Sequence, residues 1–198
     1  MRIGIFGGSF NPPHKMHKSI VKELLKAKYI DKAIVIPTAD NYNKPYLLKG
    51  VDRVKMLEGI FKNCENVEVS DYEVTGHLYT LNTLNYYHEK YPKAELYFIL
   101  GTDLLAGFDK WFKYEEILKN YKLLVIARDT NDFYKELEKF KKYSKNITLA
   151  NIRPRIVSST QVRNEILKNG YTDNLKKLLY VDTINYLKKI DIKKYWNL

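Results

Sequence analysis

The sequence predicts an α/β fold: an open parallel sheet with helices on both faces, in a single domain over residues 1–198. Short apolar runs alternate with amphipathic stretches along the whole chain, which is the pattern of repeated β-α units. The runs 96–100 and 123–126 are apolar throughout, as expected of parallel strands buried on both faces. No linker, low-complexity segment or internal repeat divides the chain, and its length fits one domain with a full core.

The expected elements follow in chain order from these patterns. Strands are predicted at 2–6, 32–37, 67–70, 95–100, 122–127 and 147–150. Helices are predicted at 17–28, 51–62, 79–91, 113–120, 131–143, 159–168 and 181–190, with a helical C-terminal segment from about residue 159. Because ligands bind at the carboxyl ends of the strands in open α/β sheets, the residues just after the strands are the first candidates for a site.

The first seventeen residues read MRIGIFGGSFNPPHKMH and combine the features of an anion site. A strand ends at Gly7-Gly8, and His14 and His17 follow. A helix is expected to begin just after His17, where apolar residues recur at helical spacing. Glycines let the backbone approach a phosphate closely, and a helix N-terminus supplies N–H donors. The alternative is an ordinary strand-to-helix turn with surface histidines. Neither a Walker-type loop nor a G-x-G-x-x-G fingerprint is present.

A second candidate phosphate contact lies near the end of the chain. Ser158, Ser159 and Thr160 precede a helical run, and one of the two serines is a natural N-cap. The hydroxyls and free amides of such a turn suit a phosphate, and Arg163 lies one turn inside the helix, where it can reach the same anion. Capping serines are common, so this pattern becomes specific only together with the N-terminal one.

The motifs G-G-S-F-N-P-x-H-x-x-H and S-S-T-x-x-R together resemble those of the nucleotidyltransferase superfamily and, within it, the nicotinate/nicotinamide mononucleotide adenylyltransferases. Three further segments carry the narrower resemblance: Tyr79–Leu84, Gly101–Ile117 and Pro37–Arg53, the last with Lys44 in its loop. The resemblance spans Met1 to about Leu167. It implies a Rossmann-like sheet and an enzyme of NAD biosynthesis that transfers the adenylyl group of ATP to nicotinate mononucleotide.

The resemblance also implies roles for individual residues. The residues expected to bind ATP are Gly8, Ser9, Phe10, His14, His17, Gly101, Asp103, Ser158, Ser159, Thr160 and Arg163. Those expected to bind the mononucleotide are Lys44, Tyr79, Thr80 and Trp111, with the indole stacking on the pyridine ring. The expected catalytic residues are His14, His17, Lys44 and Arg163. Mg²⁺ is expected to arrive with ATP, because no carboxylate cluster predicts a metal site of the protein's own.

Four alternatives remain open. Asn11 and Met16 depart from the usual bacterial pattern and resemble the eukaryotic branch, so nicotinamide mononucleotide is a candidate as main or second substrate. A pantetheine-phosphate adenylyltransferase shares the histidine and serine motifs but not the Tyr79–Leu84 segment. A class I aminoacyl-tRNA synthetase fragment lacks its lysine signature here. A non-catalytic nucleotide or nucleic-acid binding module is the alternative of a different class.

The net charge and the cysteine count limit the classes of partner and the cellular location that we expect. The net charge of +11 fits either polyanionic substrates or a lysine-rich surface, and the second reading is favoured because the lysines are dispersed and no nucleic-acid motif is present. No nucleic-acid partner is therefore expected. No membrane segment is expected either, because no stretch approaches the ~18 apolar residues that a membrane span needs. Cys64 is the single cysteine, which excludes an intramolecular disulfide and fits a cytoplasmic location. Arg53 is expected to be a structural ion-pair partner, and a homo-oligomer remains open.

Overall fold

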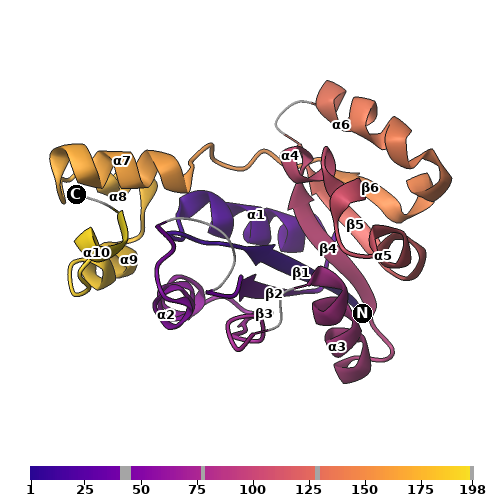
Figure 1. Ribbon diagram of the computed structural model, residues 1–198, viewed down its shortest axis with the longest axis horizontal. Helices are drawn as coiled ribbons and strands as arrows, with labels where there is room; N and C mark the ends of the chain where they lie inside the picture. The colour runs from indigo at the N-terminus through magenta and orange to yellow at the C-terminus, as the bar shows by residue number, and fades with distance from the viewer. Residues whose placement is uncertain (41–45, 77–78, 128–129, 197–198) are drawn as a thin grey trace.

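A computed structural model describes residues 1–40, 46–76, 79–127 and 130–196. Its centre is one six-stranded sheet with the strand order β3-β2-β1-β4-β5-β6, and every pairing is parallel (Figure 1). The strands are β1 (Arg2–Gly8), β2 (Lys32–Pro37), β3 (Val67–Val69), β4 (Glu95–Gly101), β5 (Lys122–Ile126) and β6 (Ile147–Ala150). All six predicted strands are confirmed, and so is the open parallel sheet.

Helical elements connect and cover the strands. They are α1 (Lys15–Lys26), α2 (Gly50–Phe61), α3 (Thr80–Lys90), α4 (Thr102–Leu105), the 3-10 helix η1 (Phe108–Lys110), α5 (Tyr114–Asn120), α6 (Thr130–Leu137), the 3-10 helix η2 (Glu138–Asn146), α7 (Ser159–Asn169), α8 (Leu175–Leu178), α9 (Val181–Leu187) and α10 (Lys193–Trp196). The single-turn elements α4, η1, α8 and α10 were not predicted, because one turn is too short to show a helical period.

Alternate strand residues enter two hydrophobic clusters, one on each face of the sheet. In β4, for example, Phe98 and Leu100 join the cluster beneath α3, α5 and η2, whereas Ile99 joins the cluster beneath α1 and α2. Both faces are therefore buried, as the uninterrupted apolar runs predict. A third cluster holds the C-terminal helices together and includes Leu48 and Met56.

The C-terminal helices pack beside the first half of the sheet, far from β6, where the preceding strand ends. The segment 151–158 runs above α1 in the view of Figure 1 to reach α7, and α7 to α10 then lie at the opposite side of the molecule from α5 and α6. The Tyr186 hydroxyl of α9 donates to Asp52 Oδ1 of α2 at 2.8 Å. This crossing brings the start of α7 to the end of β1.

Three helix predictions were wrong at their boundaries, and one of them, 181–190, ends at Leu187. The first helix begins at Lys15 rather than after His17, because its first turn is polar and lacks the apolar spacing used to place it. The predicted helix 131–143 ends as an α-helix at Leu137 and continues as η2, with non-helical dihedrals at Phe140 (φ −112°, ψ 26°). Phe140 is buried in the core against Phe108 and Tyr114. The free energy gained by burying this ring exceeds the cost of interrupting the regular helix.

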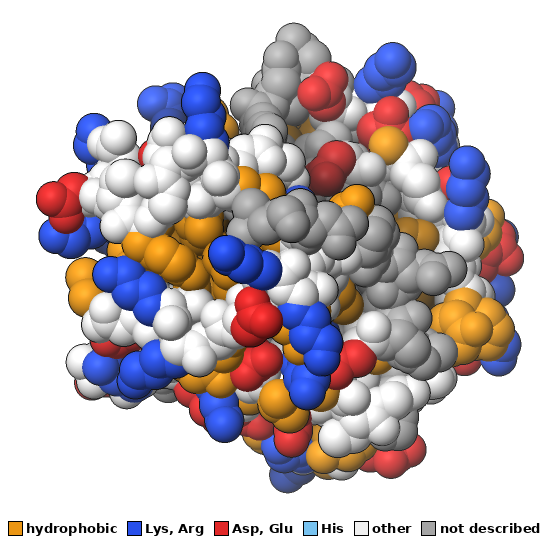
Figure 2. Space-filling view, turned by 60° about the vertical axis from the view of Figure 1, so that its left-hand side comes forward, with side chains coloured by type: hydrophobic (Ala, Val, Ile, Leu, Met, Phe, Trp, Pro, Cys, Tyr) orange, Lys and Arg blue, Asp and Glu red, His pale blue; other side chains and the backbone are white. Residues whose placement is uncertain are grey.

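The surface has charges of both signs. Figure 2 shows lysine and arginine side chains scattered over one face among acidic and hydrophobic ones, without a single basic field. That distribution agrees with the dispersed lysines of the sequence. Within the described part of the chain, no helix has the length and apolar character needed to cross a membrane.

Candidate active site

A cavity of about 800 Å³ runs along the carboxyl ends of β1, β4, β5 and β6. His14 and His17 line it after β1, Gly101 and Asp103 after β4, and Ser158 and Ser159 at the start of α7. Strand β1 pairs with both β2 and β4, so the strand order reverses at β1. Ligands of open α/β sheets bind at such a reversal, where loops leave in opposite directions and open a crevice.

The two histidines form a stacked pair at the start of α1. Their ring centroids are 3.6 Å apart with an interplanar angle of 19°. His14 is the N-cap, and its backbone N–H donates to His17 Nδ1 at 3.0 Å. Since His17 Nδ1 accepts, the neutral ring carries its proton on Nε2, which is then a donor. The edge-on ring of Phe10 packs on His17 with a centroid distance of 4.8 Å.

Burial keeps both imidazoles neutral near pH 7. Burial lowers the pKa of His14 to about 4, and burial together with the neighbouring His14 holds the pKa of His17 well below 6.5. A neutral imidazole offers one N–H donor, so this pair provides hydrogen bonds rather than positive charge in the free protein. His14 Nδ1 is buried and has no hydrogen-bond partner among the described residues.

The loop 9–13 that carries the motif is held from several sides. Asn11 is buried; its Nδ2 donates to Tyr46 O at 2.7 Å, and its Oδ1 accepts from Leu48 N at 3.1 Å. Arg163 Nη1 donates to Asn11 O at 2.8 Å, and Ser159 Oγ donates to Pro12 O at 3.0 Å. Residues almost 150 positions apart in the sequence therefore position the same loop.

The buried side chain of Arg53 donates hydrogen bonds to this loop and to the backbone beside it. Its side chain is fully buried and donates to three backbone carbonyls, those of Ser9 (3.1 Å), Thr38 (2.7 Å) and Leu48 (2.8 Å). It also forms an ion pair with Asp40 at 2.8 Å, and burial lowers its pKa. The predicted structural ion pair is confirmed, although the carbonyl contacts were not anticipated. Arg53 joins the ends of β1 and β2 to the start of α2.

The serine turn is built as predicted. Ser158 is the N-cap of α7, and its Oγ accepts from Gln161 N at 3.1 Å. Ser158 and Ser159 line the cavity, which places the start of α7 beside the histidine pair. Arg163 and Thr160 do not line the cavity: Arg163 Nη2 contacts Thr160 Oγ1 at 3.0 Å while Nη1 bonds the loop. Arg163 thus positions the site in this structure.

Three of the residues predicted to bind the mononucleotide, Tyr79, Thr80 and Trp111, do not line this cavity. Tyr79 and Phe112 are both 47% exposed, and their rings are in contact with centroids 4.5 Å apart. Thr80 is the first residue of α3, where backbone N–H groups lack helical partners. Trp111 is half-buried on the core, with its ring 4.9 Å from Phe108 and 5.7 Å from Phe98. Lys44 lies outside the described residues.

Several residues of the cavity were not predicted. Arg153 and Ile156 of the segment 151–158 line it, and so do Asp132, Lys135 and Glu136 of α6. No sequence motif marks them, because they reach the cavity only through the crossing segment and the helix after β5. Gly101, in contrast, was predicted, and the structure gives a reason for glycine there. A Cβ at position 101 would lie 2.3 Å from Asp103 Oδ1, so the observed Asp103 conformation requires glycine.

The carboxylates give no metal cluster. Within the described residues, no group of three or more His, Cys, Asp or Glu side chains could hold a metal ion. Of the carboxylates that line the cavity, Glu136 already forms an ion pair with Lys139.

The same fold and sequence pattern occur in known proteins. Residues 5–165 match the model of the cytidylyltransferase-like family. A probable nicotinate-nucleotide adenylyltransferase of Caldicellulosiruptor bescii is 31% identical over 198 residues, covering 96% of this chain and 97% of the relative. A probable nicotinate-nucleotide adenylyltransferase of Aliarcobacter butzleri is 41% identical over 131 residues, covering 65% of this chain and 72% of the relative.

Solved structures show the same fold. The Plasmodium falciparum nicotinic acid mononucleotide adenylyltransferase, complexed with NaAD, superposes with a TM-score of 0.80 and covers 98% of each chain. At 22% identity this likeness concerns the fold alone. The sequence relatives carry the assignment: this chain belongs to the cytidylyltransferase-like family and, within it, to the nicotinate-nucleotide adenylyltransferases.

Proposed function

We propose that this enzyme transfers the adenylyl group of ATP to nicotinate mononucleotide, giving nicotinate adenine dinucleotide and pyrophosphate. The observation that carries the proposal is the cavity at the β1 and β4 ends, where a neutral histidine pair meets the serine turn of α7. Two helix starts, α1 and α7, lie at this point, and helix starts bind phosphate. The family relatives bear the name of this reaction.

The chemistry requires positioning rather than a base. The 5′-phosphate of the mononucleotide attacks the α-phosphorus of ATP in line, and the bond to pyrophosphate breaks. A phosphate monoester, with a second pKa of about 6, is already largely dianionic at neutral pH, so no proton has to be removed. His17 Nε2–H is fixed by its Nδ1 contact and donates to the α-phosphate, where negative charge is redistributed in the transition state.

The remaining ATP contacts are assigned to His14, Ser158 and Ser159, which line the cavity, and to further residues of the predicted site. His14 and the hydroxyls of Ser158, Ser159 and Thr160 bind the phosphates, with Gly8, Ser9 and Phe10 shaping the loop that approaches them. Lys44 and Arg163 supply positive charge to the β- and γ-phosphates. Arg163 would exchange its Asn11 contact for a phosphate oxygen. Asp103 accepts from a ribose hydroxyl beside Gly101. Mg²⁺ enters with ATP and neutralises charge on the triphosphate.

The second substrate is placed at the start of α3. The backbone N–H groups at Tyr79 and Thr80 donate to both oxygens of the nicotinate carboxylate, an anion favoured at a helix N-terminus. Trp111 stacks on the pyridine ring with the face that its core contacts leave accessible. We further propose that residues 1–198 act as one nucleotidyltransferase unit and, given the single cysteine, that the protein works in the cytoplasm.

A three-substrate assay tests the proposal. Pyrophosphate release from ATP is measured with nicotinate mononucleotide, nicotinamide mononucleotide or phosphopantetheine, each offered singly. The expected result is turnover with the nicotinate substrate, weaker turnover with the nicotinamide substrate and none with phosphopantetheine. Nicotinamide mononucleotide is the second candidate because Asn11 and Met16 resemble the eukaryotic branch. Turnover of phosphopantetheine alone, or ATP binding without any turnover, would contradict the proposal.

A further inference from the structure

The cavity has two chemically different ends. At the β1 and β4 ends it is lined by the histidine pair and the serine turn. Beyond them, in the sheet order, come β5 and β6, and there the lining is Ile126, Ala127 and Ile152, closed by α6. A nucleotide with its phosphates at the first end and its ribose at Asp103 therefore extends its base toward β5, β6 and α6.

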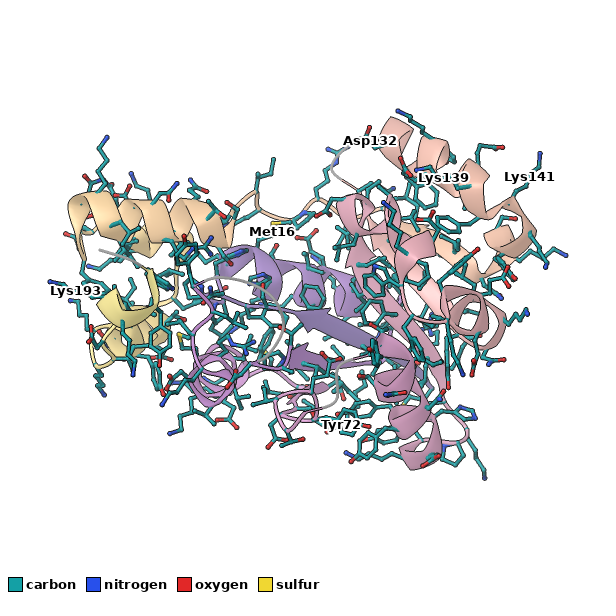
Figure 3. The ribbon with its side chains drawn as sticks, viewed as in Figure 1. Met16, Tyr72, Asp132, Lys139, Lys141 and Lys193 are labelled. Atoms are coloured by element: carbon teal, nitrogen blue, oxygen red, sulfur yellow. The ribbon has the colours of Figure 1, made fainter. Side chains whose placement is uncertain are left out.

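Helix α6 presents two unpaired polar side chains to this second end. Asp132 and Lys135 are exposed and line the cavity, and neither makes a hydrogen bond or ion pair within the described part of the chain. Their neighbour Glu136 differs, because Lys139 forms an ion pair with it. Figure 3 shows Asp132 at the end of α6 nearer to Met16, which also lines the cavity, and Lys141 near the opposite end of this region.

The spacing of this pair matches the edge of one base. Residues at i and i+3 on a helix have Cβ atoms about 5–6 Å apart, so a carboxylate acceptor and an ammonium donor stand side by side. Adenine presents the complementary pattern, an N6 amino donor beside the N7 acceptor, whereas guanine presents two acceptors, O6 and N7. The apolar side chains of Pro154 and Ile156 line the same cavity and offer a surface for the ring face.

We propose that Asp132 and Lys135 read the base of the donor nucleotide: the Asp132 carboxylate accepts from the adenine N6 amino group, and the Lys135 ammonium donates to N7. The inference rests on the proposed function for the identity of the donor nucleotide. It makes α6 the element that selects ATP over GTP, because guanine would set its O6 lone pairs against the carboxylate. The effect falls on nucleotide affinity, since neither side chain lies at the phosphates.

Nucleotide analogues that lack one group each test the two contacts separately. The variants Lys135→Met and Asp132→Ala are compared with the unmodified enzyme using ATP, 7-deaza-ATP (no N7 acceptor), purine riboside triphosphate (no N6 amino group) and GTP. Lys141→Met is the matched control, because it removes the same charge from the neighbouring 3-10 helix at a residue that does not line the cavity. Pyrophosphate release gives kcat and KM for each nucleotide.

Each variant should lose about five- to tenfold in kcat/KM for ATP, the scale of one partly exposed hydrogen bond, and nearly all of the loss should be in KM. Lys135→Met should equal the unmodified enzyme within twofold on 7-deaza-ATP, and Asp132→Ala should equal it on purine riboside triphosphate. Asp132→Ala should also raise the GTP-to-ATP ratio about tenfold. Lys141→Met should change none of these values.

Equal losses on ATP and on the matching analogue would overturn the proposal, because a merely structural or electrostatic role does not depend on N6 or N7. An unchanged GTP-to-ATP ratio in Asp132→Ala would overturn the carboxylate contact. If the enzyme turns over none of the three phosphate acceptors, the proposed function fails, and the base contacts are then tested independently by calorimetric binding of the same four nucleotides.

Discussion

The proposed phosphate end and the proposed pyridine end of this enzyme differ in how deeply their side chains are buried. At the proposed phosphate end, Asn11 and His14 are 5% and 3% exposed, and the loop 9–13 accepts hydrogen bonds from Arg53, Arg163 and Ser159. At the pyridine end, Tyr79 and Phe112 are each 47% exposed. The first end is buried and held by hydrogen bonds, whereas the second presents aromatic side chains to solvent.

We expect changes at the proposed phosphate end to act mainly on kcat, and changes at the proposed pyridine end to act mainly on substrate affinity. Donors that are fixed in advance stabilise charge in the transition state without reorganising, so their loss lowers kcat. Exposed aromatic surface is covered when a ligand stacks on it, so its loss weakens binding. Five changes, from the largest expected effect to the smallest, test whether the two ends divide the work in this way.

Replacing His17 should have the largest effect. His17→Ala is expected to lower kcat about 10²–10³-fold, the scale for removing one preorganised donor at a developing charge. His14→Ala should lose more of its rate through KM for ATP, because its ring lies at the N-cap rather than inside the first turn. Steady-state kinetics measure both. Turnover by a correctly folded His17→Ala protein within threefold of the unmodified enzyme would remove the assigned role.

Arg53 tests the rigidity of the phosphate end. Arg53→Met should lower the free energy of unfolding by roughly 3 kcal/mol, because one buried and two part-buried backbone carbonyls lose their donor and each unsatisfied buried group costs about 1–3 kcal/mol. Denaturant unfolding measures the loss. Arg2→Met is the control, since its ion pair with Asp31 is exposed and should contribute far less. Equal effects of the two variants would show that the loop does not depend on Arg53.

Trp111 tests the pyridine end. Trp111→Ala should weaken binding of the mononucleotide by roughly 1–3 kcal/mol, the scale of base–aromatic stacking, and leave ATP affinity nearly unchanged. Calorimetric titration of each ligand separates the two. Because Trp111 packs on Phe98 and Phe108, Trp111→Phe is the companion variant that keeps an aromatic ring. A parallel fall in ATP affinity would mean a core defect and no stacking role.

Substrate preference sharpens the same comparison. We expect nicotinate mononucleotide to exceed nicotinamide mononucleotide about tenfold in kcat/KM, equivalent to about 1.4 kcal/mol. In the proposed complex, backbone donors at the start of α3 would face both oxygens of a carboxylate, whereas a carboxamide would set an NH₂ donor against one of them. Competition of both substrates in one assay measures the ratio. Equal rates would show that the features resembling the eukaryotic branch, Asn11 and Met16, decide specificity.

The buried histidines predict a gradual pH effect. The folded pKa of His14, about 4, lies below the ordinary 6.5, so the unfolded chain takes up a proton first and stability is lost as pH falls from about 6.5 toward 4. His14→Gln should reduce that slope by at most about 1.4 kcal/mol per pH unit. The comparison of variant and parent is needed because buried Glu73, with a raised pKa of about 7, acts in the opposite sense. Unfolding at pH 7 and pH 5 gives both slopes, and identical slopes would contradict the buried neutral histidine.

Much of the fold followed from local pattern. Strands of a parallel sheet are continuous apolar runs, so their positions were predicted within two residues. One of Ser158 and Ser159 was predicted as a helix cap because capping chemistry is local, and the structure shows that it is Ser158. The boundary of α1 was wrong because a polar first turn has no period. The break in the helix at Phe140 was missed because it is stabilised by burial of the Phe140 ring in the core, which is a tertiary contact.

The sequence by itself determined the sheet, the two phosphate motifs and the family, since each depends on residues close together in the chain. Only the tertiary structure decided which distant groups share one site. The segment 151–158 carries α7 back across α1, so Arg163 meets Asn11, and the helix after β5 brings Asp132 and Lys135 into the cavity. Such contacts depend on the order of strands in space and on the course of the crossing segment, and no local spacing of residues encodes either.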